Sequence, residues 1–398
     1  MSLNVAVGTS VERNPTLAAQ SAVAMARQQR NIDRPDLVIL FAGVGYDQRA
    51  AVRAVRAATG EAPLVGCSTE GIISRDGSVE EPYSMLVALF KSDRHRFSVA
   101  SAVGMKDDAE KVGQGIGAAL KPSVASDSLV TLLFPDGLTL NYDRLTAGLA
   151  RGAGPECQLP PLMGGAAGDN WQFKKTYQYA NDDVFSDGAS ALLISGEGKL
   201  VTSVNHGCVP IGAERKVTKS HENRIYEIDG RSALDVLREY VEIDEQQDWA
   251  KVLVHLAIGF KAPGFMQDRD EHIIRYIPQK NDEEGWITIN TAVPEGSSIW
   301  MTRRDYDKIS TSLDRSAREI RDGVGEREVD VVFQFDCAGR GKVIFRDNEK
   351  QQLLDKTRKL IGVDVPWLGF HSYGELGPVS AVNCFHSFTA VFGALVRG

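Results

Sequence analysis

One glycine-bearing segment occurs three times in this chain of 398 residues, and it limits the possible folds more than any other feature. Residues 63–71 read PLVGCSTEG, residues 366–374 read PWLGFHSYG, and a weaker copy at residues 161–168 reads PLMGGAAG. Each copy follows an apolar run, a polar loop and a stretch with helical spacing, and another apolar run comes after it. Repetition of this kind determines architecture before any single residue does. It predicts a duplicated strand-helix-strand-strand unit, with functional residues near the recurring glycine turns.

The intervals between the copies argue against a regular solenoid, whose period would be shorter and stricter. Gly164 and Gly369 are about twice as far apart in sequence as Gly66 and Gly164. This longer interval leaves room for an eroded unit between residues 220 and 330.

Hydrophobic periodicity, with glycine and proline as breakers, predicts strands and helices along the whole chain. Helices are expected at 15–30, 48–58, 109–120, 142–150, 232–241 and 310–320. Strands are expected at 4–9, 36–41, 84–90, 97–103, 129–134, 189–195, 200–205, 249–260, 273–276, 286–291, 298–302 and 331–335. Residues 84–90 are expected to pair with 97–103, and 189–195 with 200–205 as a hairpin, while the polar residues 216–224 suit a linker. The pattern indicates an α/β fold with mixed sheets, built from duplicated β-α-β-β units in two closely packed halves.

Composition excludes several classes of protein. The net charge of −8 at pH 7 argues against a general nucleic-acid binder, which needs a basic face for phosphates. The longest uncharged stretch, residues 376–396, contains Gly377, Pro378 and His386, so a strand suits it better than a membrane span. No signal peptide is expected at the N-terminus. Five cysteines without a CxxC pair suggest a reducing cytoplasm.

Five ordered motifs together resemble the FIST sensory proteins. They are Gly66-Cys67-Ser68-Thr69, Gly164-Gly165-Ala166-Ala167-Gly168-Asp169, His206-Gly207-Cys208-Val209-Pro210-Ile211-Gly212, Asp336-Cys337-Ala338-Gly339-Arg340-Gly341 and Gly369-Phe370-His371-Ser372-Tyr373-Gly374-Glu375. The resemblance implies a FIST N-type domain at residues 1–220 and a FIST C-type domain at 221–398. It also implies an intracellular signal-input module that binds a small ligand. Some relatives are haem proteins that sense nitric oxide and act on a partner histidine kinase.

Two residues depart from the family pattern. The first copy ends Glu70-Gly71, where the family usually has Gly-Glu, and His371 stands where an aromatic residue is expected. Both departures bear on the identity of the ligand. No kinase, cyclase or methyl-acceptor segment is present in the sequence, so signalling is expected to pass through a separate protein.

The candidate ligand-binding residues lie in these motifs. Arg340 follows a buried strand, where a guanidinium can hold a carboxylate or phosphate by two parallel hydrogen bonds, or form an ion pair with Asp336 or Glu375. Asp169 can cap a turn or accept bonds from a ligand. The full set expected at the ligand is Arg340, Cys337, Tyr373, Glu375, His371, Asp169, Gly164, Gly165 and Cys67.

Two histidines are the candidate iron ligands in the alternative that the protein binds haem. A neutral imidazole can bind haem iron, and His371, on a turn expected to face the pocket, is the first candidate. His206, beside Cys208, is the second. The alternative for both is a structural histidine, because a lone histidine carries no ligand spacing. Both are metal ligands only if haem binds, and no other cofactor is indicated.

A catalytic function is not expected. Cys67 and Cys208 are the candidate nucleophiles for a cysteine-dependent enzyme, but no local motif supplies a base, and Gly-x-Ser-x-Gly and P-loop motifs are absent. The sequence therefore predicts a cytoplasmic, non-catalytic sensory protein that binds a small ligand such as an amino acid or organic acid. The partner is a small molecule, with a separate histidine kinase or other signalling protein downstream, without nucleic acid or membrane. The oligomeric state is open.

Overall fold

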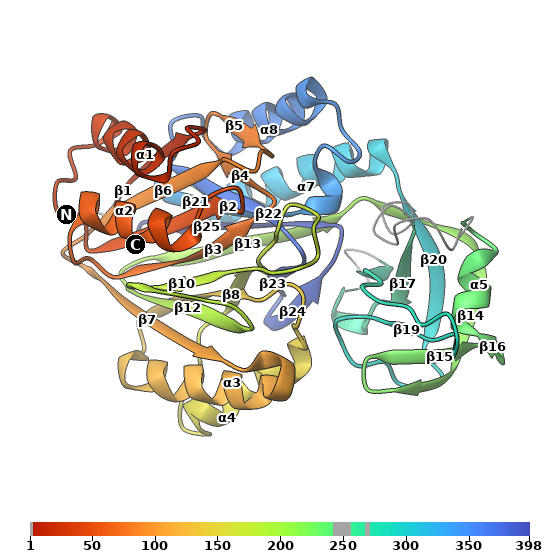
Figure 1. The fold of residues 1–398 in the computed structure, drawn as a ribbon. Coiled ribbons are helices and arrows are strands. Elements are labelled where there is room, and N and C mark those ends of the chain that lie inside the picture. The colour runs from red at the N-terminus through yellow and green to blue at the C-terminus, as the bar shows by residue number, and fades with distance from the viewer. Residues whose placement is uncertain (1–2, 242–255, 267–270) are drawn as a thin grey trace.

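Three copies of one unit form the body of the protein in the computed structural model, which describes residues 3–241, 256–266 and 271–398 (Figure 1). The first copy contains β1 (Asn4–Ser10), α1 (Pro15–Gln29), β2 (Leu37–Gly43), α2 (Gln48–Thr59), β3 (Leu64–Thr69), β4 (Gly71–Ser74), β5 (Gly77–Val79) and β6 (Met85–Lys91). The second contains β7 (His95–Val103), α3 (Met105–Leu120), η1 (Lys121–Ser123), β8 (Ser128–Pro135), α4 (Tyr142–Ala153), β9 (Leu162–Gly165), β10 (Gln178–Ala180), β11 (Asp183–Phe185) and β12 (Gly188–Gly196). The third contains β13 (Lys199–His206), α7 (Tyr306–Val324), β21 (Val329–Cys337), η3 (Ala338–Arg340), α8 (Asp347–Ile361), β22 (Trp367–Ser372), β23 (Glu375–Val379), β24 (Val382–His386) and β25 (Thr389–Val396).

The third copy is interrupted by residues 207–305, here called the inserted domain. It contains β14 (Cys208–His221), β15 (Arg224–Ile228), β16 (Arg231–Ser232), α5 (Ala233–Arg238), β17 (Ala257–Lys261), η2 (Gly264–Met266), β18 (His272–Arg275), β19 (Ile287–Thr288) and β20 (Ser298–Arg304). These strands form a separate sheet that lies beside the body in Figure 1. The interval between residues 220 and 330 therefore holds most of this domain instead of an eroded unit. Residues 249–255 of the strand expected at 249–260 lie outside the described residues.

Each sheet of the body combines strands from two copies. Their orders are β1-β6-β2-β3-β10-β11, β24-β23-β9-β8-β12-β7 and β13-β25-β21-β22-β4-β5. The first copy lends β4–β5 to the third, the second lends β10–β11 to the first, and the third lends β23–β24 to the second. The exchange is cyclic, and the two helices of each copy cover the outer face of its own sheet (Figure 1). The mixed α/β architecture and the repeated unit predicted from the sequence are confirmed.

Both strand pairings that were expected between neighbours in sequence are wrong. β6 pairs with β1 and β2, whereas β7 pairs with β12. β12 pairs with β7 and β8, whereas β13 pairs with β25. The short connections after β6 and β12 lead from one copy to the next, so the strands that they join belong to different sheets. The linker expected at residues 216–224 is also wrong, since it falls in the paired strands β14 and β15.

The glycine repeated in the three copies lies within a strand and not in a turn. β3, β9 and β22 each run parallel to a neighbour that they approach closely. A Cβ atom would lie 1.8 Å from the Leu40 carbonyl oxygen at Gly66, 2.0 Å from that of Leu133 at Gly164, and 1.7 Å from that of Gln334 at Gly369. The close approach of the strands requires glycine at all three sites. Gly165 also lies in β9, where a Cβ would lie 2.9 Å from the Phe370 ring.

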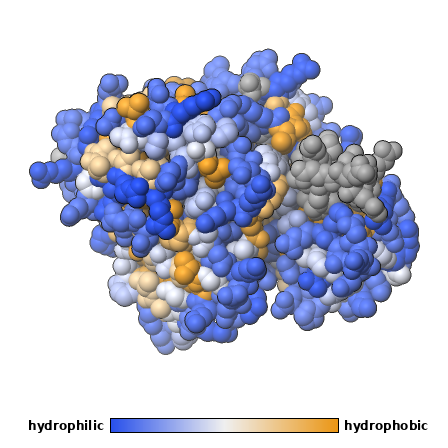
Figure 2. Space-filling view, in the orientation of Figure 1, coloured by the Kyte–Doolittle hydropathy of each residue, from blue (hydrophilic) through white to orange (hydrophobic). Residues whose placement is uncertain are grey.

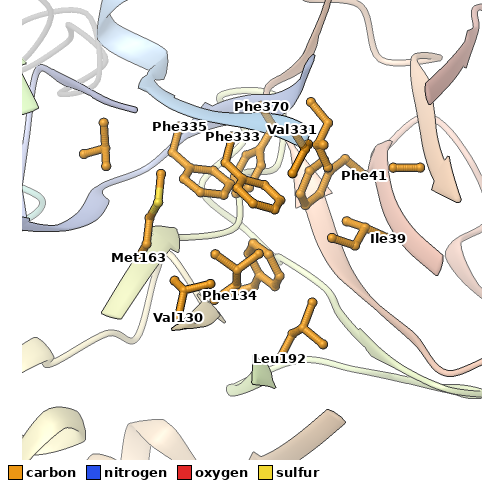
Figure 3. Close-up of a cluster of buried hydrophobic side chains, with 14 of the residues drawn as sticks. Ile39, Phe41, Val130, Phe134, Met163, Leu192, Val331, Phe333, Phe335 and Phe370 are labelled. Atoms are coloured by element: carbon orange, nitrogen blue, oxygen red, sulfur yellow. The ribbon is translucent and has the colours of Figure 1, made fainter. Parts of the chain in front are cut away.

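The inner faces of the three sheets share one core. Phe41, Phe134 and Phe335 come from equivalent strands β2, β8 and β21, and they meet around Phe370 (Figure 3). The ring centroids of Phe41 and Phe370 are 4.6 Å apart, and those of Phe335 and Phe370 are 5.4 Å apart. Such ring pairs add specific contact energy to the burial of apolar area. The core therefore fixes the three copies relative to one another and holds their strand ends in register.

The surface in Figure 2 is mainly hydrophilic, with hydrophobic residues in small separated groups. Among the described residues, no helix has the length and apolar character needed to cross a membrane.

Candidate functional site

A pocket with about 380 Å³ of free space lies where the strand ends of the body meet the inserted domain. Five aromatic side chains form most of its wall, together with small and hydroxyl-bearing residues. The lining residues are Trp171, Phe173, Tyr276, Cys337, Ala338, Gly339, Ser372, Tyr373, Ser387 and Phe388. They come from the loop between β9 and β10, the ends of β21 and β22, the connection between β24 and β25, and the residue after β18. We call it the aromatic pocket.

Three of its aromatic residues have a left-handed backbone. The φ angles are +58° at Trp171, +49° at Phe173 and +56° at Phe388. Bulky residues rarely adopt this conformation, which costs about 1–3 kcal/mol each and is concentrated at functional sites. The Phe173 ring stacks on that of Tyr373, with centroids 5.0 Å apart and planes 13° apart. The surrounding structure must therefore hold the pocket wall in a strained but defined position.

Asp169 supplies much of that support. Its carboxylate accepts hydrogen bonds from the backbone N–H groups of Phe173, Lys174 and Lys175, at 2.9, 2.6 and 2.9 Å. It also accepts one at 2.8 Å from the Tyr373 hydroxyl. Asp169 is 2% exposed and does not line the pocket. It thus acts as the turn-capping residue that was one alternative from the sequence, and it holds the aromatic loop.

Glu70 holds the same loop from the first copy. Its Oε1 accepts hydrogen bonds from the N–H groups of Trp171, at 2.8 Å, and Asp169, at 3.2 Å. Trp171 N–H also lies 2.8 Å from the Tyr373 hydroxyl oxygen. Burial raises the pKa of Glu70 to about 7, against the lowering effects of the Tyr373 hydroxyl and the Trp171 N–H. Burial likewise raises the pKa of Tyr373 well above its ordinary value.

Arg340 lies behind the pocket wall and does not line the pocket. Its side chain is 1% exposed, and Nε lies 2.9 Å from Asp336 Oδ1. Lys350 Nζ lies 2.6 Å from Asp336 Oδ2 and donates to the Arg340 carbonyl oxygen at 3.0 Å. Burial alone would raise the pKa of Asp336, but the charges of Lys350 and Arg340 outweigh it and the pKa is lowered. The ion pair with Asp336 was one of the two alternatives for Arg340.

The other acidic and thiol candidates divide between the pocket and its surroundings. Glu375 is fully buried, and it accepts hydrogen bonds from Ser372 Oγ at 2.7 Å and Thr389 N–H at 3.2 Å. Its pKa is raised well above its ordinary value by burial. Cys337 lines the aromatic pocket, and burial raises the pKa of its thiol. Cys67 packs in the central core away from the pocket. All five cysteines lie in the described ranges, and none forms a disulfide.

Neither of the two histidine candidates for haem lines the aromatic pocket. His371 is fully buried, with Nε2 2.7 Å from Ser78 Oγ and 3.6 Å from Glu80 Oε1, and it does not line the aromatic pocket. His206 lines a second pocket, whose space of about 350 Å³ includes open solvent. No cluster of three or more His, Cys, Asp or Glu in residues 3–241, 256–266 and 271–398 could hold a metal ion.

Several pocket residues were missed at the level of sequence. Ser387 is 2% exposed and lines the pocket, and its Oγ has no hydrogen-bond partner among the described residues. Phe388 and Tyr276 contact each other across the boundary with the inserted domain, with ring centroids 6.2 Å apart. Nothing in the sequence distinguishes them from core aromatics. Glu70 did carry a signal, because it departs from the family pattern inside a repeated motif.

Two family models match consecutive parts of the chain. The FIST N domain matches residues 36–231, and the FIST C domain matches residues 233–378. They meet within the inserted domain, at the start of α5.

Similar proteins occur in several organisms. An uncharacterised protein of Mycobacterium bovis is 26% identical and covers 99% of both chains. One from Mycobacterium tuberculosis is 28% identical, over 99% of this chain and 100% of its own. An uncharacterised protein of Methanocaldococcus jannaschii is 25% identical, over 82% of this chain and 67% of its own.

Two solved structures resemble the fold weakly. A cyanuric acid hydrolase from A. caulinodans aligns over the whole of both chains with a TM-score of 0.37 and 9% identity. A chorismatase does so with a TM-score of 0.35 and 11% identity. These scores are too low to bear on the chemistry of this chain.

Proposed function

This chain belongs to the FIST family, with a FIST N domain followed by a FIST C domain, and from that premise we propose that it is a sensory protein that binds a small ligand in the aromatic pocket. The observation that carries this proposal is the buried Ser387 hydroxyl, which has no partner among the described residues and lies in a pocket lined by five aromatic rings. A buried polar group without a partner costs about 1–3 kcal/mol. A ligand that bonds to Ser387 removes this cost.

The ligand is a small molecule with a flat ring, such as an aromatic amino acid or organic acid. The rings of the pocket present apolar faces, which favour stacking with a planar partner. The rings of Trp171 and Tyr373 supply one wall, and those of Tyr276 and Phe388 supply another.

Local charge favours an acidic group on the ligand. Arg304 Nη1 donates to the carbonyl oxygen of Gly339 in the pocket wall, and its guanidinium lies 5.4 Å from the centre of the Phe388 ring. Arg340 and Lys350 lie behind the same wall, where Asp336 balances one of them. The raised pKa of Glu375 favours its uncharged form, so cations are in excess on this side.

The signal passes to a separate partner, a histidine kinase or another signalling protein. The FIST N region supplies Trp171 and Phe173 to the pocket, while the FIST C region supplies Tyr276, Cys337 and Tyr373. One shared pocket therefore joins the two regions. A ligand that contacts both the body and the inserted domain stabilises their arrangement, which the partner then recognises. The location proposed for this exchange is the cytoplasm.

Binding without catalysis is proposed. Cys337 is the thiol that lines the pocket, and its raised pKa keeps it protonated and therefore weakly nucleophilic.

A thermal-shift screen of aromatic amino acids, aromatic acids and their uncharged amides tests the proposal. A compound that binds the native state raises Tm, and the rise grows with the logarithm of its concentration relative to Kd. Ser387→Ala is expected to reduce this rise by at least half, whereas Ser195→Ala should leave it unchanged. Ser195 is a matched control, because it is 1% exposed and bonds to Ser128 away from the pocket. Equal rises in both variants, or no rise with any compound, would contradict the proposal.

A further inference from the structure

One side chain from each copy meets behind the aromatic pocket. Glu70 follows β3 of the first copy, Asp169 lies in the loop after β9 of the second, and Tyr373 follows β22 of the third. Tyr373 donates to Asp169 at 2.8 Å, and Glu70 accepts the N–H of Asp169 at 3.2 Å. Glu70 and Asp169 are 3% and 2% exposed. The three strand ends are thus joined by a single buried polar cluster.

This cluster positions the loop that carries Trp171 and Phe173. Between them, Glu70 and Asp169 accept hydrogen bonds from five backbone N–H groups of the loop, those of Asp169, Trp171, Phe173, Lys174 and Lys175. Trp171 and Phe173 take left-handed backbone angles, and these bonds and ring packing help to hold them. Loss of the bonds would therefore release both rings from the pocket wall.

The cluster holds two carboxyl groups and no ion-paired cation. Within the described ranges, neither Glu70 nor Asp169 takes part in a salt bridge. The titratable groups that face Glu70 are Asp169 and the Tyr373 hydroxyl, and its other partners are backbone N–H groups. Two neighbouring carboxylates repel each other in a buried site, and one proton removes this repulsion.

We propose that Glu70, Asp169 and Tyr373 form a proton-operated latch, which holds the Trp171–Phe173 loop closed when Glu70 is protonated and loosens when that proton leaves. As a means of regulating ligand entry, the latch rests on the proposed function of the pocket. It makes sensing conditional on pH as well as on ligand.

The direction of the effect follows from the two states of the loop. Burial raises the pKa of Glu70 to about 7 in the closed state, whereas a solvated carboxyl has its ordinary pKa of about 4.3. The closed state therefore binds the proton more tightly, and closing takes up a proton between these two values. Raising the pH through about 7 weakens the latch.

Acrylamide quenching of tryptophan fluorescence in the ligand-free full chain tests the latch. The accessible fraction should rise with pH, with a midpoint near 7 in the wild type. Trp171→Phe should abolish the transition, which assigns it to the loop. Glu70→Gln should stay closed throughout, because the amide oxygen still accepts the Trp171 N–H while no carboxylate charge forms.

Two outcomes overturn the latch: quenching that does not change with pH in the wild type, and an unchanged transition in Glu70→Gln. If Glu70→Gln fails to fold, Tyr373→Phe serves instead. The Tyr373 hydroxyl lowers the pKa of Glu70, so its removal should move the midpoint upward, and an unmoved midpoint overturns the latch. The quenching experiment contains no ligand, so its result is independent of the thermal-shift screen. The latch can therefore fail while ligand binding is observed, and ligand binding can fail while the latch is observed.

Discussion

The Tyr373 hydroxyl lies 2.8 Å from Oδ1 of Asp169, and this one hydrogen bond ties the third copy of the repeat to the second across 204 positions of sequence. Asp169 in turn holds three consecutive backbone N–H groups of the loop that carries Trp171 and Phe173. A contact between copies is therefore coupled to the shape of the pocket.

Asp169→Asn should weaken this coupling. The amide can accept from fewer N–H groups and carries no charge, so the free energy of unfolding should fall by about 1–3 kcal/mol. Urea unfolding measures this loss. Asp182→Asn is the control, because the Asp182 side chain is 77% exposed and its ion pair with Arg56 should contribute under about 1 kcal/mol. Similar losses in the two variants would show that Asp169 has no special role.

Glu70 should make the protein less stable as the pH rises. Its folded pKa of about 7 exceeds the unfolded value, so the cost of ionisation is absent at low pH and complete above about 7. From the shift, unfolding free energy should fall by about 2–3 kcal/mol between pH 5 and 8 through this group. In Glu70→Gln this component should be missing, as chemical denaturation at several pH values can determine. Parallel pH profiles for the wild type and the variant would refute the assignment.

Gly66→Ala should be strongly destabilising. The new Cβ would lie 1.8 Å from the Leu40 carbonyl oxygen, so the parallel strands β2 and β3 must move apart at a cost of about 3 kcal/mol or more. Gly264→Ala is the control, since nothing lies within 4 Å of its Cβ position. The midpoints of thermal unfolding compare the two. A Gly66→Ala protein as stable as the control would mean that the close approach of the strands is not required.

Asp336→Asn should lower the free energy of unfolding, because it leaves two buried cations without a carboxylate partner. Arg340 and Lys350 would lose their shared carboxylate, and breaking such a buried pair costs about 3–5 kcal/mol. Because the folded pKa of Asp336 is lowered, its contribution is present above the ordinary value of about 3.9 and is lost as the pH falls below it. The variant should lack this acid-sensitive component, whereas Asp127→Asn, at an exposed pair with Arg96, should retain it. Denaturant titrations from pH 3 to 7 measure this component. An acid-sensitive component that persists in Asp336→Asn would contradict the role assigned to Asp336.

Hemin should bind without a stoichiometric site. His371 is fully buried with Nε2 2.7 Å from Ser78 Oγ, and neither it nor His206 lines the aromatic pocket. Titration should give a broad absorption band that does not saturate and does not change in His371→Ala. A sharp Soret band at one equivalent, lost in His371→Ala or His206→Ala, would restore the haem sensor.

Local sequence patterns predicted the helices and strands well, but they did not predict which strands pair with one another. The Asn14 cap, the apolar spacing of residues 48–58 and the breaks at glycine and proline act within a few residues, and the corresponding helices formed. Strand pairing depends on which copy lends a hairpin to which sheet, and no local signal records that exchange. Adjacency in sequence therefore misled at β6–β7 and β12–β13.

The candidate site was predicted only in part, because local sequence patterns do not record contacts between distant segments. Tyr373, Cys337 and Asp169 stand in recognisable motifs, and they lie in or directly behind the aromatic pocket. Glu70 and Ser387 become significant only through burial and hydrogen bonding between distant segments. Arg340 was judged from its residue type, whereas the nearby Asp336 and Lys350 determine its surroundings.

The cyclic lending of hairpins has a consequence for how the chain acquires its structure. The second sheet is incomplete until β23–β24 arrives from near the end of the chain, so no copy can finish folding alone. Pairings between segments this remote in sequence make folding slow, because the chain must lose the entropy of closing a long loop before the stabilising contacts can form. Nascent chains that lack the final hairpin would present open strand edges, which are prone to aggregate and are natural substrates for chaperones.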